Sequence, residues 1–387
     1  MSPDTQNTKV SRALCMLLSG QAAQIDWATF SPADWNLLPS IAQGEGAAPL
    51  LYSILERAAA DGQPVGGSLP PTVKTELAQS YYASAAFNAL LCRELDGILA
   101  ALTRASVPVI LLKGASLIKT IYADSAERPM SDLDLLVRRD HIRPAVRALQ
   151  NAGYQRLMDN YIRYHVLLLD RQAGRVSVEL HWSLVLNDQR FPALIDWFWR
   201  QSEPLDPANP LVLTLTPTAQ LLYLAAHLAL QHTGQARLIW YYDLYRLITR
   251  LGDCANDLSH IDWDDLLQQA SQVSWADALL QALDGAQARF GFALPDGFRP
   301  LLQEQAGLQP AQAGGMVGSA SDRRSRSVAK TWGGLSTHDR LRMAWNILLP
   351  RPAYLRWRYH PRPAWLWPLW YLRRWGDLVV DGVKATV

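Results

Sequence analysis

Two aspartates separated by one residue stand in the apolar segment Asp132-Leu133-Asp134-Leu135-Leu136-Val137. Successive side chains of an extended strand point to opposite faces, so the two carboxylates share one face while Leu133 and Leu135 fill the other. Two carboxylates, together with phosphate oxygens and water, suit the octahedral oxygen shell of Mg²⁺. An Asp-x-Asp pair can also be only a polar strand end. The spacing nevertheless favours a strand over residues 132–137 with one face that holds metal.

A second segment upstream has the composition of a phosphate-binding turn. An apolar stretch, residues 109–112, runs into Lys113-Gly114-Ala115-Ser116 and then into an expected helix. Glycine lets the backbone approach a phosphate closely, and the first N–H groups of a helix attract anions. We therefore predict that Lys113, Gly114 and Ser116 bind a triphosphate. For Lys113 the alternative is a lysine that only reaches from apolar surface to water.

A third carboxylate is expected on a later strand, within residues 175–182. The alternation of this segment places Glu179 and His181 on one face and valines on the other. Three carboxylates can hold two ions, one of which activates an attacking hydroxyl while the other stabilises a pyrophosphate leaving group. Glu179 is therefore the predicted third ligand. His181 either orients an acceptor and assists proton transfer or is an interior histidine.

These segments together resemble the nucleotidyltransferases with a DNA-polymerase-beta-like fold. More closely, the stretch from about Tyr81 to Asp243 resembles a poorly characterised bacterial nucleotidyltransferase family, some members of which occur in peptide-biosynthesis settings. The residues that carry the resemblance are Lys113-Gly114, Arg128, residues 132–137 and Glu179-Leu180-His181-Trp182. Two features depart from the superfamily pattern: Lys113-Gly114-Ala115-Ser116 replaces the usual Gly-Ser, and the gap between Gly114 and Asp132 is longer.

The resemblance implies a transferase that moves a nucleoside monophosphate from an NTP to an acceptor and releases pyrophosphate. Its expected cofactors are Mg²⁺, with two ions, and the NTP as co-substrate. The acceptor is expected to be a small biosynthetic molecule or a peptide. Alternatives are a tRNA-modifying enzyme like the nucleotidyltransferase toxins, an ATP-dependent kinase, and an inactive scaffold protein.

Three further residues are candidates for contacts around the reacting groups. Arg128 precedes the aspartate strand, where it either contacts triphosphate or substrate or pairs with a nearby acid. Trp240-Tyr241-Tyr242-Asp243 resembles an element that follows the catalytic domain in the family, so Asp243 either contacts the nucleotide or acceptor or caps a helix. His227 is expected to support the site from the core. His232, five residues on, would point about 140° away on a continuous helix, which argues against a shared metal.

The predicted fold class is α+β, with a small mixed-sheet catalytic domain flanked by helical regions. We place a helical region over residues 1–105, the catalytic domain over 106–216 and a helical domain over 217–305. A linker rich in Gly, Ala, Gln, Ser and Arg covers 306–335, and a Trp/Arg-rich region covers 336–387.

Hydrophobic periodicity predicts the individual elements. Strands or extended segments are expected over residues 108–112, 132–137, 154–157, 162–169 and 175–182. Helices are expected over residues 10–18, 32–42, 47–60, 72–105, 115–122, 140–152, 218–233, 236–251, 263–272, 275–290 and 336–349.

Composition sets limits on the class of protein. The formal net charge of +2 over 387 residues gives no general bias toward polyanions. Three widely spaced cysteines, Cys15, Cys92 and Cys254, are typical of buried thiols rather than of disulfides or zinc ligands. The N-terminus lacks the pattern of a signal peptide, and no apolar run has a membrane-spanning length. We therefore expect a cytoplasmic protein.

The C-terminal region interleaves six tryptophans with arginines. Such a composition can stack on nucleobases, anchor a protein partner or lie at a membrane surface. Prolines at 350, 352, 361, 363 and 368 exclude one continuous helix. Intramolecular packing or a protein partner is favoured over RNA or a membrane.

Overall fold

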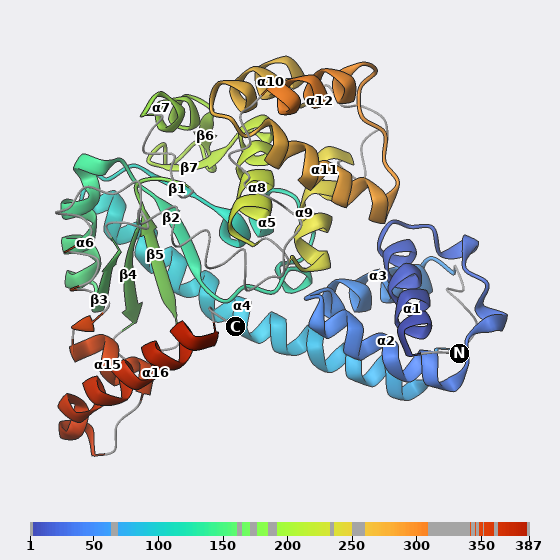
Figure 1. Cartoon of the computed structure of the whole chain (residues 1–387), viewed down its shortest axis with the longest axis horizontal. Coiled ribbons are helices and arrows are strands. Elements are labelled where there is room, and N and C mark those ends of the chain that lie inside the picture. Colours follow the sequence, from blue (N-terminus) through green and yellow to red (C-terminus); the bar gives the residue numbers. More distant parts are fainter. Residues whose placement is uncertain are drawn as a thin grey trace.

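The structure is a computed structural model, and it describes residues 3–62, 69–160, 165–170, 176–184, 192–232, 236–249, 260–308, 341, 345, 348–350, 352–359 and 363–384. A mixed sheet lies against helices on both of its faces, with further helices at either end of the chain (Figure 1). The predicted α+β class is confirmed.

One sheet contains seven strands of the described residues, in the order β3-β4-β5-β2-β1-β7-β6. The strands are β1 Val109–Leu111, β2 Leu133–Leu136, β3 Tyr154–Asn160, β4 His165–Asp170, β5 Ser177–His181, β6 Ser202–Pro204 and β7 Val212–Leu215. The centre of the sheet is β2, which pairs antiparallel with β1 and parallel with β5. The strand that carries Asp134 therefore has a neighbour on each side.

Alternation along the central strands divides the core into two parts. Ile110 and Leu136 belong to a large cluster built mainly from the N-terminal helices and from the helices that follow the sheet, up to residue 302. Leu111 and Leu135 belong to a second cluster with the last part of α4 (Pro71–Arg104) and with α6 (Ile142–Asn151). Because Asp134 has the same parity as Leu136, the acidic face of β2 looks toward the larger cluster.

Four helices precede the sheet: α1 Pro3–Leu18, α2 Pro32–Gly44, α3 Ala48–Ala60 and α4. A capping box starts α2, in which Ser31 and Asp34 each bind the other's backbone N–H. The first part of α4 buries Val73 and Leu77 in the larger cluster, and its last part reaches the sheet. In Figure 1 this long helix runs from the N-terminal helices to the sheet. It ties the two regions together.

The remaining helices cover the sheet and form the region that follows it. Around the sheet lie α5 Lys113–Thr120, α6 and α7 Pro192–Arg200. The later helices are α8 Pro217–Gln231, α9 Leu238–Thr249, α10 Trp263–Gln272, α11 Ala276–Phe290 and α12 Phe298–Leu308. The residues of α8 are buried on almost every side. This helix is therefore the centre of the larger cluster.

The C-terminal region forms α15 Pro352–Tyr359, a 3₁₀ segment Ala364–Leu369 and α16 Trp370–Lys384. Leu355 is fully buried, and α15 packs against β3. Three long-range hydrogen bonds hold the region together: Tyr359 to Asp377, Tyr371 to the Pro350 carbonyl and Trp375 to the Leu348 carbonyl. The region thereby adds a layer beside the edge strand of the sheet (Figure 1).

Most predicted elements are present, with ends that differ by a few residues. The helix expected at 115–122 begins earlier, at Lys113, and the helix expected at 236–251 is α9. The prediction missed α7, β6, β7 and α12, because short apolar stretches broken by prolines carry little periodicity. Most of the helix expected at 336–349, and nearly all of the linker expected at 306–335, lie outside the described residues.

Cys15 and Cys92 are free thiols, both partly buried, and Cys254 lies outside the described residues. Burial raises the pKa of the Cys15 thiol to about 11. Within the described part of the chain, every helix is too short or too polar to cross a lipid bilayer.

Candidate active site

Three carboxylates gather on the larger-cluster side of the central strands. Asp134 of β2 is the register partner of Glu179 on β5, so these side chains stand beside each other on one face. Asp132 stands two residues before Asp134, and the negative charges of Asp134 and Glu179 both act on it. The structure therefore brings the three predicted acids together.

Lys113 reaches the same carboxylates from the start of α5. Its Nζ lies 3.1 Å from Asp134 Oδ1, and 22% of its side chain is exposed. The Lys113 backbone has φ of +46°, a left-handed conformation that costs a non-glycine residue about 1 kcal/mol. A strained residue of this kind persists where the surroundings fix it, often at functional sites. The turn thereby aims a cation at the aspartate pair.

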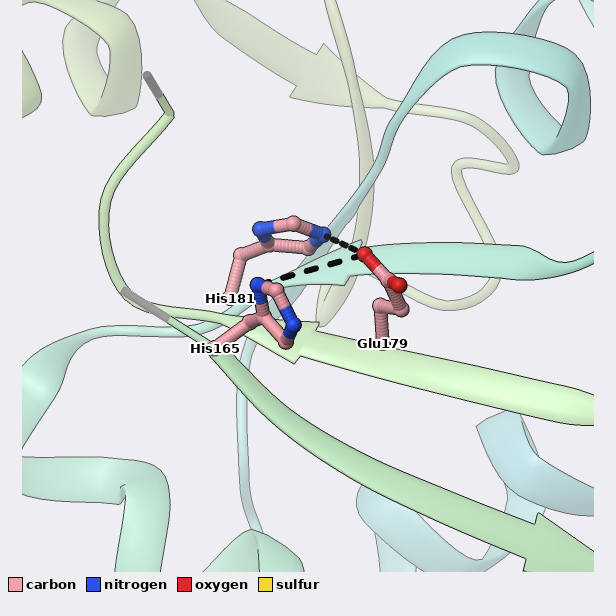
Figure 2. A group of neighbouring side chains, drawn as sticks. All are labelled: His165, Glu179 and His181. Carbon is pink, nitrogen blue, oxygen red and sulfur yellow. Dashed lines mark ion pairs between the residues drawn. The ribbon is translucent and has the colours of Figure 1, made fainter. Parts of the chain in front are cut away.

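Two histidines complete the cluster, as Figure 2 shows. His181 Nε2 lies 2.8 Å from Asp134 Oδ1 and 3.5 Å from Glu179 Oε2. His165 of β4 is the register partner of His181, and its Nδ1 lies 3.9 Å from Glu179 Oε2. The rings of both histidines face the Glu179 carboxylate. His165 was missed from the sequence, since only the pairing of β4 with β5 brings it here.

The carboxylates have strongly different proton affinities. Burial, together with the charge of Asp134, raises the pKa of Asp132 to about 7. Burial would also raise the pKa of Asp134, but Lys113 and His181 outweigh it and hold that pKa below its usual range. Asp134 is therefore ionised at neutral pH, whereas Asp132 is only partly ionised without a further cation.

The partner groups shift in the complementary direction. Burial lowers the pKa of Lys113, but the charge of Asp134 outweighs it and raises the pKa above its usual value. For His181, hydrogen bonds to Asp134 and Glu179 outweigh burial and raise the pKa. The pKa of Glu179 is lowered, because its hydrogen bond with His181 outweighs burial. The site is thus a compact set of opposed charges.

Gly114 is needed for close packing beside the acidic strand. A Cβ added at this residue would lie 2.7 Å from Cγ and 2.9 Å from Sδ of Met130. These separations are shorter than van der Waals contact, so a larger residue would push Met130, two residues before Asp132. The glycine therefore brings α5 against the segment that leads into β2, in addition to its predicted role at a phosphate.

Ser116 lies away from the carboxylates. Its buried hydroxyl is 2.7 Å from the Thr214 hydroxyl on β7, and its carbonyl accepts a hydrogen bond from Thr120. The structure gives Ser116 a role between α5 and β7, and its contact with phosphate stays a prediction.

Arg128 forms a buried ion pair with Asp243 of α9. Its Nε and Nη2 lie 2.8 to 3.0 Å from the two carboxylate oxygens, and its Nη1 donates to the Pro129 carbonyl at 2.7 Å. The Tyr122 hydroxyl donates to the same carboxylate at 2.6 Å. This fork-shaped pair joins the catalytic sheet to the helical region. Contacts of Arg128 and Asp243 with substrate stay predictions.

Polar residues of α4 hold the loop that leads to β2. The Asn88 amide donates to the carbonyls of Ser125 and Arg128 and accepts from the Met130 N–H at 3.3 Å. Ser84 donates to the Ala126 carbonyl at 2.8 Å. These buried contacts fix the start of the aspartate strand. The sequence gives one signal for them, namely polar residues on an otherwise apolar stripe of a long helix.

A second polar group anchors the same loop to α3. The buried carboxylate of Glu127 accepts hydrogen bonds from Ser53 and Arg57, both on α3. Nearby, the Tyr81 hydroxyl binds Asp124, whose hydrogen bond raises the pKa of Tyr81 to about 12. The loop is therefore fixed by α3, by α4 and, through Arg128, by α9.

His227 and His232 lie closer together than expected. Their ring centroids are 4.6 Å apart, because α8 ends at Gln231 and His232 leaves the helical path. The two rings therefore do not point about 140° apart, as expected for a continuous helix. Burial, with the positive charge of Lys113, lowers the pKa of His227 well below its usual value. His227 is a neutral group near the site, as its predicted supporting role requires.

The donor set fits a divalent cation. Three carboxylates lie beside one partly exposed lysine and two histidines, and burial together with the charge of Asp134 raises the pKa of Asp132 to about 7. Oxygen ligands from Asp132, Asp134 and Glu179 suit Mg²⁺, and a cation among them would favour the ionised form of Asp132.

An acidic strand beside a cationic turn, on a mixed sheet between helical regions, is the arrangement expected of a nucleotidyltransferase. The family model described as "Uncharacterised nucleotidyltransferase" matches residues 31–291, and the chain belongs to this family. The protein is therefore a transferase enzyme of the nucleotidyl-transfer type. No match was found among the curated proteins or among the solved structures.

Proposed function

We propose that the protein transfers a nucleoside monophosphate from an NTP to a small-molecule or peptide acceptor in a Mg²⁺-dependent reaction that releases pyrophosphate. The observation that carries the proposal is the register of β2 and β5, which sets Asp134 beside Glu179, with Asp132 just before β2 and within reach of both charges. A hydroxyl, phosphate or amine on the acceptor would attack the α-phosphorus of the NTP.

Each residue has a role that follows from its position. Asp132 and Asp134 would hold the cations, and Glu179 would complete the set on the acceptor side. The ions, when bound, lower the pKa of the attacking group and neutralise the charge of the leaving pyrophosphate. Lys113 would turn its ammonium from Asp134 to the triphosphate, and the N–H groups at the start of α5 would face the same anion.

His181 and His227 would act beside the ligands rather than as primary ligands of Mg²⁺. His181 Nε2 lies 2.8 Å from Asp134 Oδ1 and 3.5 Å from Glu179 Oε2, and as a donor to these carboxylates it would fix their orientation. His227 adds no positive charge that would compete with the ion. An NTP co-substrate agrees with a cytoplasmic location.

The test is transfer of label from α-labelled and γ-labelled NTP in the presence of Mg²⁺ and extract of the host cell. We expect label to move from the α position with wild type and with Asp140→Asn, a matched change of an exposed acid in the 3₁₀ turn that follows β2. With Asp134→Asn we expect a loss of at least about 100-fold.

Label from the γ position alone would identify a kinase and contradict the proposal. Labelled tRNA, instead of a small molecule or peptide, would correct the acceptor class. The scaffold alternative predicts two results together. The wild type would transfer neither label to any component of the extract, and Asp134→Asn would still perform the role of the protein in the cell.

A further inference from the structure

Two histidines of the site, which the proposed function does not use as metal ligands, lie beside Glu179. His165, Glu179 and His181 each offer one ligand atom, and these atoms lie within 4.8 Å of one another. Adjacent separations are 3.9 Å from His165 to Glu179 and 3.5 Å from Glu179 to His181. Ligand atoms about 2.0 to 2.2 Å from one ion stand roughly 3 to 4 Å apart, so the cluster has the size of a metal site.

A fourth ligand atom stands next to this cluster. Asp134 Oδ1 lies 2.8 Å from His181 Nε2, close enough for both atoms to bind one ion. The set would then contain two imidazole nitrogens and two carboxylate oxygens. Its ligands come from β4, β5 and β2, three neighbouring strands whose registers fix the spacing.

The nitrogens decide which ion this position would take. Mg²⁺ prefers oxygen ligands and keeps several waters, whereas imidazole suits first-row transition metals. We propose that His165, Glu179, His181 and Asp134 form a site for a divalent transition metal ion, such as Mn²⁺ or Zn²⁺, beside the Mg²⁺ platform. The inference deepens the proposed function and rests on it for the role of the ion, although the binding can be measured separately.

The two ions would then have different roles in the reaction. Asp132 stands outside the nitrogen-bearing set, and its oxygen would serve the ion that accompanies the triphosphate. Glu179, shared with the histidines, would hold the transition metal on the acceptor side. Because such an ion lowers the pKa of a bound hydroxyl more than Mg²⁺ does, it suits an acceptor that needs activation.

The test measures Mn²⁺ binding to the metal-stripped full chain by the electron paramagnetic resonance signal of free Mn²⁺, in a large excess of Mg²⁺. We expect one bound Mn²⁺ per chain that Mg²⁺ does not displace. His165→Asn should weaken this binding at least about tenfold. The matched control His141→Asn, at the start of α6, should leave it unchanged.

Asp132→Asn separates this proposal from the proposed function. The variant should keep the Mg²⁺-resistant Mn²⁺ site and lose nucleotidyl transfer. Full displacement of Mn²⁺ by Mg²⁺, or equal binding by His165→Asn and wild type, would overturn the metal proposal and leave the proposed function standing. Loss of the site in Asp132→Asn to the same degree as in His165→Asn would also overturn it.

A second, independent observation concerns the C-terminal region. Of the eleven large hydrophobic side chains exposed among the described residues, eight lie between residues 341 and 375. Trp365 is 73% exposed, Leu372 is 63% exposed and Leu369 is 59% exposed. The region is nevertheless folded, with Trp375 and Tyr371 bonded to its own backbone. These apolar groups are thus presented on a surface rather than left on a loose chain.

Charge indicates what covers this surface. Residues 341–376 contain seven arginines and neither aspartate nor glutamate, and the side chains of Arg356, Arg358 and Arg373 are exposed. Leucine side chains do not stack on nucleobases, so an RNA would leave them exposed, whereas the acyl chains of a lipid bilayer would bury them. Arginine and tryptophan favour the headgroup region of a bilayer. We infer that the described residues between 341 and 376 dock on a lipid surface with anionic headgroups.

The test is co-sedimentation of the full chain with vesicles of phosphatidylcholine alone or mixed with phosphatidylglycerol. We expect binding to the anionic vesicles that weakens with salt, and a loss of about tenfold when Trp365 and Leu372 are changed together to Ala. Tyr82→Ala, which removes an aromatic group on α4 that is 63% exposed, should bind as wild type does.

Equal binding to both kinds of vesicle would overturn the charge argument, and equal binding by the double variant would overturn the assigned surface. Retention of single-stranded RNA, without vesicle binding, would replace the lipid by a nucleic acid and refute the proposal.

Discussion

Replacement of Asp132 by Asn should make the metal-free protein more stable at neutral pH. The carboxyl of Asp132 has a pKa of about 7 in the folded chain, against 3.8 for an unperturbed aspartate. Between these two values the folded state binds more protons than the unfolded state, so stability falls as pH rises from about 4 to about 7. Above pH 7 the wild type has lost all the stability that depends on a protonated Asp132. Asparagine does not ionise, so the variant would not lose it.

The size of the effect follows from the same two values. A difference between 3.8 and about 7 corresponds to about 4 kcal/mol if nothing relaxes. Asp132 is partly exposed and can approach water and Lys113, so we expect about 1 to 2 kcal/mol of gain at pH 8. At pH 5 the wild type has lost only about a third of the stability that ionisation of Asp132 removes, so the stabilisation by Asp132→Asn should be smaller in proportion.

The assay is urea unfolding in the presence of a chelator at pH 5 and pH 8, with Asp140→Asn as the matched control. Added Mg²⁺ should narrow the difference at pH 8, because the ion stabilises the ionised wild type more than the variant. A variant as stable as wild type at pH 8, or a gain that does not fall at pH 5, would refute the reasoning about charge crowding.

Three other changes test the remaining parts of the site. Lys113→Gly and Lys113→Ala should each reduce nucleotidyl transfer by about 100-fold. The glycine variant should be about 1 kcal/mol more stable in urea than the alanine variant, because glycine adopts φ of +46° freely. Equal stability of the two variants would argue against strain at this turn. Gly114→Ala should cost about 1 to 3 kcal/mol in thermal unfolding, because the added methyl displaces Met130, and Met130→Ala in the same chain should recover most of it. Asp243→Ala should destabilise the fold by about 3 to 5 kcal/mol because it leaves Arg128 buried and unpaired, and a loss of transfer without a loss of stability would instead assign Asp243 to substrate binding.

The catalytic strand could be predicted from the sequence because its information is local. Alternation around Asp132 and Asp134 sets their common face, and Glu179 lies in a segment with the same alternation. What the alternation cannot provide is the order of strands, which decides that Glu179 stands beside Asp134. The structure supplies that order, because the register of β2 and β5 pairs Asp134 with Glu179.

The contacts that were missed depend on pairs far apart in the chain. Asn88 meets its partners about forty residues later, and Arg128 meets Asp243 after 115 residues. A polar residue on a helix gives no sign of its distant partner, and a buried arginine has the same local sequence as an exposed one. His165 was missed for the same reason, since its position opposite His181 exists only once β4 and β5 have paired.

The anchoring of the loop at residues 124–130 limits how the chain can be divided. Its buried polar groups find their partners on α3, on α4 and, through Asp243, on α9, all outside residues 106–216. An excised fragment 106–216 would keep every predicted ligand except His227 and Asp243, yet would expose the carbonyls and carboxylates that those helices satisfy. We therefore expect that the catalytic unit is not modular: a fragment that forms the site must include at least α3 to α9, and transplanting the acidic strand alone would carry the ligands without their support.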